Sequence, residues 1–396
     1  MLLTLVKTFV QHWSQMIMLF MSALFLVACG GGSSNSPAPS SAALSSVSSL
    51  NASSSTTSVA SVASVASMAA SSLVSASASS SASVLTNAQR INAATQTAQN
   101  HSLCVAVQPF YWEIGDKNSA LASASVGGST YAADTVMSIA SASKWIFAAY
   151  IAQLRAGQLT SADIASLTMR AGYTNFGDKS CVKLLQSLQD TQTVNECFQT
   201  ANPSGGSNSD FDANAVGHFS YDGGHFQKMA VDLGLGSYNN ASLQAEVQRL
   251  LGTDFVLTYT MPQPAGGVST SSANYAIFLR KILNNQLHIH DLLGSNAVCT
   301  NLQSTLNNTT CTQLPLYTPA PNSVSFNYSL GHWLEDDPIV GDDAFSSAGT
   351  FGFYPWIDAT KAYYGVLARK ANVNSGFESI DCGRLIRKAW VAGMEQ

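Results

Sequence analysis

Charged residues are scarce in this sequence, and one long stretch has none. Lys, Arg, Asp and Glu make up 10% of the 396 residues, against roughly a quarter in an ordinary soluble domain. Lys7 is the only charged residue before Arg90, so all 23 acidic residues lie beyond that point. This pattern excludes a nucleic-acid binder with a basic face and a charged disordered tail. The part from Arg90 onward is long enough for one large domain or two small ones.

The sequence also lacks an apolar run of the roughly 20 residues that a membrane-spanning helix needs. Its apolar segment near the start, residues 16–28 (MIMLFMSALFLVA), is shorter and follows the positive charge of Lys7. A short apolar segment behind a positive charge is typical of a secretory signal peptide. We therefore expect export rather than a transmembrane helix.

The last residues of this segment, Leu26 to Cys29 (LVAC), resemble a bacterial lipobox. The resemblance implies that residues 1–28 are a lipoprotein signal peptide, cleaved before Cys29, and that lipid is attached to the Cys29 sulfur. Several acyl chains together hold a protein firmly at a membrane. Gly30 stands where the inner-membrane retention signal has Asp, so we predict a lipid-anchored protein of the bacterial cell envelope, at the outer membrane. The alternative is an ordinary signal peptide with a chance cysteine.

Residues 29–88 lack the aromatic and charged variety of a packed element. From Gly30 to about Val84 the chain consists almost entirely of Ser, Ala, Gly, Val and Thr, and it includes the repetitive segment SVASVASVASMAASS. Such composition is typical of flexible linkers, and Ser-rich sequence has low helix propensity. We predict a disordered tether that precedes a folded domain at residues 89–396.

The cysteines lack the CxxC spacing that is typical of metal sites. Six cysteines follow Cys29, and short separations favour two local bridges among them. The two cysteines that remain then join the start of the domain to its end. The predicted disulfides are Cys104–Cys382, Cys181–Cys197 and Cys299–Cys311, which indicate an oxidising compartment. Free buried thiols are the alternative.

Other residues with the chemistry of metal ligands form no convincing site. His288 and His290 have no evident third ligand. The acidic residues from Glu335 to Asp343 are typical of a solvated loop, with calcium binding as the alternative. We predict no metal site and no cofactor.

Strand-like segments lie at both ends of the domain, and helix-like segments lie between them. Runs rich in β-branched and aromatic residues predict strands at 104–114, 119–126, 349–357 and 362–368. Apolar periodicity predicts helices at 145–154, 241–251, 275–283 and 376–392. We therefore expect an α/β (α+β) fold in which an antiparallel sheet from the N- and C-terminal strands is flanked by helices. A mostly helical insertion would occupy about 150–325.

Ser141 and Lys144 form an S-x-x-K motif at the start of an apolar helix. Residues three apart share a helix face, so the hydroxyl and the amine can meet. A lysine that is desolvated enough to be neutral can accept the serine proton and thereby create a nucleophile. Ser180 and Lys183 repeat the motif in a polar, cysteine-containing loop. A chance proximity of Ser and Lys on the surface is the alternative.

Four further segments follow the motif in an order that resembles serine hydrolases related to class C β-lactamases and penicillin-binding proteins. FSYDGG at 219–224 is similar to the family's F-x-Y-S-N, and PAGGVST at 264–270 is similar to its A-G-G-hydrophobic-S-T. YSLGHW at 328–333 resembles its Y-x-L-G-W strand, and SAGTFG at 347–352 stands in place of its K-T-G or H-x-G strand. The resemblance implies a β-lactamase/transpeptidase-like fold and an acyl-enzyme mechanism.

The resemblance also implies a role for each matched residue. Ser141 attacks a carbonyl carbon, and Lys144 takes or shares its proton. Tyr221 assists as a base and then protonates the leaving group. The backbone N–H groups of Ser141 and Thr350 form the oxyanion hole. The implied substrate-binding residues are Gly223, Ser347 and Gly349.

Two departures from the family pattern bear on the function. Gly223 replaces an Asn, and Ser347 replaces the Lys or His whose charge pairs with a β-lactam carboxylate. We therefore predict a serine hydrolase that acts on a small-molecule or peptide ester or amide, an esterase or amidase rather than a true β-lactamase. The alternative is a non-catalytic, penicillin-binding-like envelope protein that binds cell-wall peptide. Tyr173 begins a literal Y-x-N and is the alternative to Tyr221, which we favour for its place in the order of segments.

Overall fold

The structure is a computed structural model, and it describes residues 85–177, 181, 192–301, 311 and 313–396. The predicted signal peptide, the lipidation site Cys29 and all but the last residues of the predicted tether lie outside the described residues, as do Ser180 and Lys183. Within the described part, no helix is long and apolar enough to cross a membrane.

The central element is an eight-stranded antiparallel sheet in which the two ends of the domain meet. Its strand order is β2-β1-β11-β10-β9-β8-β7-β6, so β1 from the N-terminal part pairs directly with β11 from the C-terminal part. The predicted sheet from both termini is confirmed. Its strands are β1 (Phe110–Asp116), β2 (Ala120–Val126), β6 (Val298–Cys299), β7 (Asn327–Tyr328), β8 (Trp333–Glu335), β9 (Ala344–Ser346), β10 (Tyr354–Ile357) and β11 (Tyr363–Ala368).

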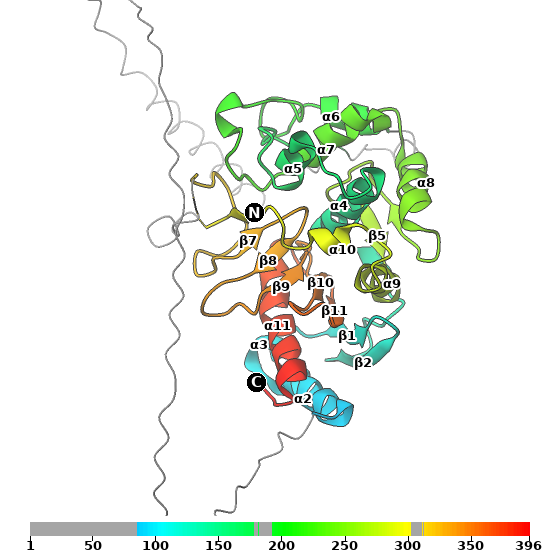
Figure 1. Cartoon of the computed structure of the whole chain (residues 1–396), viewed down its shortest axis with the longest axis vertical. Helices are drawn as coiled ribbons and strands as arrows, with labels where there is room; N and C mark the ends of the chain where they lie inside the picture. The colour runs from blue at the N-terminus through cyan, green and yellow to red at the C-terminus, as the bar shows by residue number, and fades with distance from the viewer. Residues whose placement is uncertain (1–84, 178–180, 182–191, 302–310, 312) are drawn as a thin grey trace, which may run out of the picture. The chain divides into compact units, whose positions relative to one another are not determined.

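Helices cover both faces of this sheet. Neighbouring residues of a strand point to opposite faces, and on β11 Tyr363 packs against Trp390 of α11 (Gly376–Ala392) while Tyr364 accepts a hydrogen bond from Arg280 of α9 (Ser272–Leu283). The helices α11 and α9 therefore lie on opposite faces. Figure 1 shows α11 beside α2 (Asn87–Asn100), the first described helix.

The start of the domain differs from its prediction. The strand predicted at 104–114 begins at Phe110, because residues 102–105 form the short helix α3 (Ser102–Val105), whose first turn is capped by the side chain of His101. Pro109 has no N–H group to offer a strand ladder. Helix α2 was not predicted, and it begins at Asn87, inside the predicted tether. The sequence feature that indicates the start of α2 is the capping box formed by Thr86 and Gln89.

The middle of the chain is helical, but it also forms a second, three-stranded sheet of order β3-β5-β4. This sheet joins β3 (Met137–Ser138), just before the S-x-x-K motif, to a hairpin far along the chain. The elements of the middle are α4 (Ser143–Leu154), α5 (Ser161–Leu167), α6 (Val194–Gln199), α7 (Gly224–Ala230), a π-helical turn (Val231–Leu235), α8 (Asn240–Leu251), β4 (Thr258–Tyr259), β5 (Val268–Thr270) and α10 (Ile289–Leu292), with single 3₁₀ turns at Ala140–Ala142 and Ala213–Ala215.

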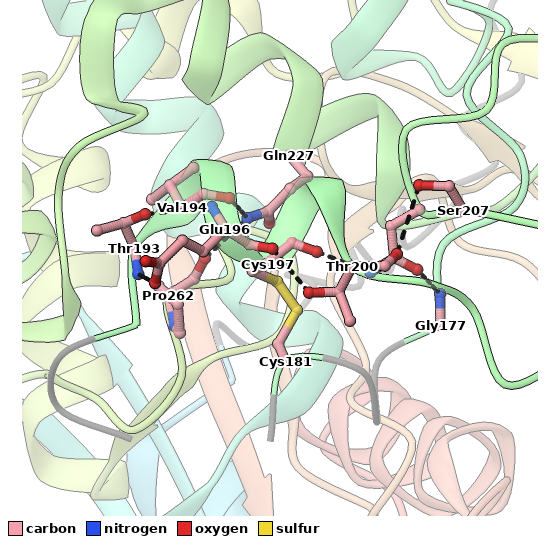
Figure 2. Close-up of a disulfide and its surroundings, with 11 residues drawn as sticks. Gly177, Cys181, Thr193, Val194, Glu196, Cys197, Thr200, Ser207, Gln227 and Pro262 are labelled. Carbon is pink, nitrogen blue, oxygen red and sulfur yellow. Dashed lines mark hydrogen bonds between the residues drawn. A yellow bond between two sulfur atoms is a disulfide. The ribbon is translucent and has the colours of Figure 1, made fainter. Parts of the chain in front are cut away.

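All three predicted disulfides are present: Cys104–Cys382, Cys181–Cys197 and Cys299–Cys311. The first joins α3 to α11 and so ties the start of the domain to its end. Figure 2 shows the second, which joins Cys181 to α6. In the loop-entropy model a bridge that closes so long a loop as Cys104–Cys382 contributes about 5 kcal/mol.

The acidic residues predicted as a solvated loop are partly buried and structural. Glu335 is fully buried, and both Glu335 and Asp342 form ion pairs with Arg387 of α11. The Asp337 carboxylate accepts hydrogen bonds from the backbone of Ser325 and Ile339. Loop charges that sequence alone assigned to solvent thus bind the C-terminal helix to the β8–β9 region of the sheet.

The segment 328–333, predicted as one strand, is two short strands joined by a tight turn. β7 ends at Tyr328 and β8 begins at Trp333, and the Ser329 N–H donates to the His332 carbonyl across the turn. Gly331 at the turn has φ +74°, which glycine adopts without steric cost. A Cβ at Gly331 would lie 2.8 Å from the Lys144 carbonyl, so the turn packs tightly on α4.

Candidate active site

Ser141 lies in a 3₁₀ turn between β3 and α4. Ile139, just before this turn, donates its N–H to the Val268 carbonyl of β5. Ala140 has φ 44°, which is uncommon for a residue other than glycine. Such backbone positions cluster at functional sites, where the surrounding structure holds them. The turn thus presents Ser141 at the surface of a cavity while the following helix is buried.

Lys144 contacts Ser141 directly. The Lys144 Nζ lies 3.0 Å from the Ser141 Oγ, and it donates a second hydrogen bond of 2.9 Å to the Ala265 carbonyl. Lys144 is 5% exposed, and no acidic side chain pairs with it among the residues that the structure describes. The Ser141 hydroxyl therefore lies within proton-transfer distance of the buried Lys144 amine.

The ring of Tyr221 forms the other side of the Lys144 environment. Its centroid lies 4.8 Å from the Lys144 Nζ, and the ring stacks on Trp333 at 5.4 Å. The Tyr221 N–H donates to the Tyr317 carbonyl, which fixes the backbone. In contrast, Tyr173 packs against Phe198 and Phe211 and does not line the cavity that contains Ser141.

His225 supports this arrangement from behind. Its Nε2–H donates to the carbonyl of Ser220, the residue before Tyr221, and its Nδ1 accepts the Ala171 N–H. Burial, with a smaller contribution from the nearby Lys144, lowers the pKa of His225 to about 4, although the hydrogen bond to Ser220 opposes this shift. His225 is therefore a neutral positioning group at physiological pH.

Ser141, Lys144 and Tyr221 share one cavity of about 420 Å³. Its other walls come from the 261–266 loop, from the region around Thr350 and from the start of α11. The Thr350 side chain is turned away toward the Asn374 N–H, and its own N–H has no hydrogen-bond acceptor within the described part of the chain. That amide is available to an oxyanion. The aromatic lining residues are Phe176, Tyr221, Tyr317, Trp333, Phe351 and Phe377.

No family model and no curated protein matches this chain in sequence. Solved structures do match. A mutant of simvastatin synthase (LovD) from Aspergillus terreus has a TM-score of 0.50 and 14% identity, over 79% of this chain and 99% of its own. An octameric penicillin-binding protein homologue from Pyrococcus abyssi has a TM-score of 0.50 and 12% identity, over 72% and 74% of the two chains. A putative β-lactamase from Bacteroides dorei has a TM-score of 0.46 and 18% identity, over 71% and 93%.

The chain has a β-lactamase-like fold. The fold that the ordered motifs implied is therefore confirmed. At these identities the likeness concerns the fold alone, so the chemistry must be argued from the residues of this chain.

Within the β-lactamase-like fold, the three predicted substrate-binding residues have different surroundings. Gly223 lines the cavity. Gly349 lies behind the turn that carries Ser141, where a Cβ would be 2.1 Å from the Ile139 carbonyl oxygen, so only glycine allows this approach. Ser347 is 3% exposed, and its hydroxyl donates to the Ser141 carbonyl at 3.2 Å. Ser347 therefore supports the turn that carries Ser141 and does not face the cavity.

Sequence reasoning missed several residues of the site. Phe176, Trp333 and Phe377 line the cavity of this β-lactamase-like fold without belonging to a predicted role. Trp333 had a signal, because it ends the segment that resembles Y-x-L-G-W. Phe176 directly follows the Y-x-N match at Tyr173, yet nothing in the sequence indicated that it reaches the cavity.

The residues considered as metal ligands are used in other ways. His290 contacts the Ile282 carbonyl through its Nδ1. Among the described residues there is no group of three or more His, Cys, Asp or Glu side chains that could hold a metal ion.

Proposed function

We propose that this protein is a serine hydrolase that forms an acyl-enzyme at Ser141 with an ester or amide. The observation that carries the proposal is the 3.0 Å contact between the Ser141 Oγ and the buried Lys144 Nζ, which has no acidic partner within the described residues. Both atoms lie at a cavity that is large enough for a small substrate.

The proposed reaction has two acyl transfers. In the first, neutral Lys144 accepts the Ser141 proton as the Oγ bonds to the substrate carbonyl carbon. The tetrahedral oxyanion accepts hydrogen bonds from the N–H groups of Ser141 and Thr350. One such donor typically contributes about a hundredfold or more to the rate. The bond to the leaving alcohol or amine then breaks as Lys144 gives up the proton it accepted, which reaches the leaving group directly or by way of the Tyr221 hydroxyl.

In the second transfer, water adds to the acyl carbon and gives one proton to the same base. The carbon–Oγ bond breaks, the acid is released, and Ser141 regains its proton. No metal or cofactor takes part in the proposed steps. Lys144 is the only cation among the described residues that line the cavity. This favours an ester or amide without a carboxylate beside the scissile bond, which distinguishes the proposal from efficient β-lactam hydrolysis.

A fluorophosphonate probe tests the nucleophile. We expect one adduct at Ser141 in the full chain and none in Ser141→Ala. Ser138→Ala is the matched control, because Ser138 lines the same cavity without a lysine partner, and it should still be labelled. A panel of p-nitrophenyl esters, D-Ala peptides and nitrocefin then ranks the substrate classes, and nitrocefin turnover faster than every ester would contradict the esterase or amidase assignment.

A second candidate function is a non-catalytic protein that binds cell-wall peptide, and the exchanges at Gly223 and Ser347 favour it. It requires an intact fold, measurable binding of a D-Ala-D-Ala peptide and no Ser141 adduct. The fluorophosphonate experiment therefore separates the two candidates.

We further propose that the protein is lipid-anchored at Cys29 in a bacterial cell envelope, at the outer membrane. The lipobox-like residues and the three disulfides support this location. Expression in a bacterium fed an alkyne fatty acid should label the wild-type chain and leave Cys29→Ser unlabelled. Labelling of both chains would reject Cys29 as the site.

A further inference from the structure

Gly223 and Phe176 together replace a polar side chain by an aromatic ring. Gly223 stands where the related family has Asn, and a Cβ built on it would lie 3.1 Å from the Phe176 Cδ1 and 3.5 Å from the Ala265 Cβ. The space that an Asn side chain would enter is therefore bordered by the Phe176 ring. Both residues line the cavity that contains Ser141.

Phe176 is held in place by hydrogen bonds rather than lying on a free loop. Its N–H donates to the Asp222 carboxylate at 3.3 Å, and the same carboxylate accepts the Gly224 N–H at 2.7 Å. The loop of Phe176 is thus bound to the start of α7, the helix that follows Tyr221. A change at Phe176 acts on a ring whose backbone has a fixed position.

A second set of contacts joins the Phe176 loop to α6. The Gly177 N–H donates to the Asn208 Oδ1 at 2.9 Å, and the Asn208 Nδ2 donates to the Cys197 carbonyl at 2.9 Å. Figure 2 shows Gly177, Cys197 and the disulfide that joins Cys197 to Cys181. The disulfide and α6 therefore support one wall of the cavity.

The cavity offers few charges to a substrate. Lys144 and Asp222 are its only charged lining residues among those described, and the Asp222 carboxylate accepts the backbone N–H groups of Phe176 and Gly224. Removing an apolar group from water beside the Phe176 ring lowers the free energy of binding. A polar group placed there loses its hydrogen bonds to water, and the ring offers no equivalent partner.

We propose that Phe176 is a specificity-determining residue that selects substrates with an apolar acyl group. The acyl chain lies against the Phe176 ring in the space left by Gly223, while its carbonyl carbon faces Ser141. This inference rests on the proposed function, because it assumes acyl transfer to Ser141.

The test measures kcat/KM for p-nitrophenyl acetate, propionate and butyrate, and for the methoxyacetate, which has the length of butyrate with an oxygen in place of one methylene. Each rate is divided by that of hydroxide-catalysed hydrolysis to remove intrinsic reactivity. For the wild type we expect about a three- to fourfold rise for each added methylene, and a preference for butyrate over methoxyacetate.

In Phe176→Ala the rise should fall below twofold for each methylene. The double variant Gly223→Asn, Phe176→Ala should lower the ratio of butyrate to methoxyacetate at least tenfold, because an amide can donate to the ether oxygen. Phe211→Ala is the control, since this ring is exposed, lies outside the cavity, and should leave every ratio unchanged. If Phe176→Ala does not fold, Phe176→Leu replaces it as the variant that removes the aromatic ring.

The outcomes distinguish this inference from the proposed function. A wild-type chain with neither a Ser141 adduct nor ester turnover overturns the proposed function, and the inference falls with it. A chain that labels at Ser141 and hydrolyses the esters, but whose chain-length ratios are the same in wild type and in both Phe176 variants, overturns the inference alone.

Discussion

Two buried cations of this protein are surrounded in opposite ways. Arg387 of α11 is 1% exposed, and its guanidinium donates to Glu335, to both oxygens of Asp342 and to the Tyr354 hydroxyl. Lys144 is also buried, but its Nζ contacts a serine hydroxyl, a backbone carbonyl and the ring of Tyr221. One cation has a full set of anionic partners, and the other has none within the described residues.

The difference indicates what each cation is for. A buried charge is tolerated when carboxylates and hydrogen bonds compensate for its lost water, so the Arg387 group holds α11 to the β8–β9 region. Lys144, in contrast, contacts a serine hydroxyl with which it can exchange a proton. We therefore expect Arg387 to determine stability and Lys144 to determine rate.

The largest effect is expected from Lys144→Met, which keeps an unbranched side chain and removes the amine. Acylation of Ser141 should slow by about 10³- to 10⁴-fold, because the serine loses its proton acceptor. The unfolding free energy should stay the same or rise, since an uncompensated polar group leaves the interior. Stopped-flow labelling with a fluorophosphonate and urea unfolding measure the two quantities. A large loss of stability would show that Lys144 is structural, like Arg387.

The reverse result is expected for Arg387→Met. The unfolding free energy should fall by about 3–5 kcal/mol, because Glu335 and Asp342 lose their cation while Glu335 stays buried. The rate for each active site, counted by fluorophosphonate titration, should not change. If stability is kept while the rate falls, the contrast between the two cations is wrong.

The next largest effect on rate is expected at Tyr221, whose ring contacts Lys144. Tyr221→Phe should lower kcat/KM by about a hundredfold, the usual contribution of one acid–base group. Tyr173→Phe is the matched control, because Tyr173 lies outside the cavity, and its rate should equal that of the wild type. Equal losses in both variants, measured with one p-nitrophenyl ester, would remove the distinction that the structure draws between them.

Acid should destabilise the protein through its buried histidines. Burial lowers the pKa of His225 and of His332 to about 4, while an exposed histidine titrates near 6.5. Between these values the unfolded chain binds more protons, so the unfolding free energy falls as pH falls. We expect a loss of about 2 kcal/mol for each histidine between pH 7 and pH 5. Measured by urea unfolding, the fall in unfolding free energy between pH 7 and pH 5 should be about 2 kcal/mol smaller in His225→Gln than in the wild type. His288→Gln is the control, because His288 is exposed, and its fall should equal that of the wild type.

The smallest effect is expected from Ser347→Ala. Its hydroxyl donates to the Ser141 carbonyl, so its removal should cost about 1 kcal/mol of unfolding free energy. Because Ser347 does not face the cavity, KM for a neutral ester should stay within twofold of the wild-type value. A KM that rises tenfold would make Ser347 a substrate-binding residue after all.

Much of the fold was predictable from local patterns. The turn at 358–361 and helix α11 follow from turn residues and apolar periodicity, which are properties of neighbouring residues. The sheet from both termini was indicated by strand-like segments at the two ends of the domain. The 104–114 strand was misplaced and α2 was missed, because a capping box and a proline act at single positions that composition does not register. The part of the tether before residue 85 and the lipidation site Cys29 stay predictions.

The sequence by itself determined that Ser141 and Lys144 meet, since a spacing of three on one helix face leaves little freedom. It also favoured the disulfide pairing that the structure shows, because two short loops leave Cys104 and Cys382 as the remaining pair. Only the tertiary structure decided that Phe176 borders the space beside Gly223, that Ser347 turns away from the cavity, and that Lys144 has no acidic partner within the described part. These relations join residues 47 to 206 positions apart, and they depend on how whole elements pack rather than on any local pattern.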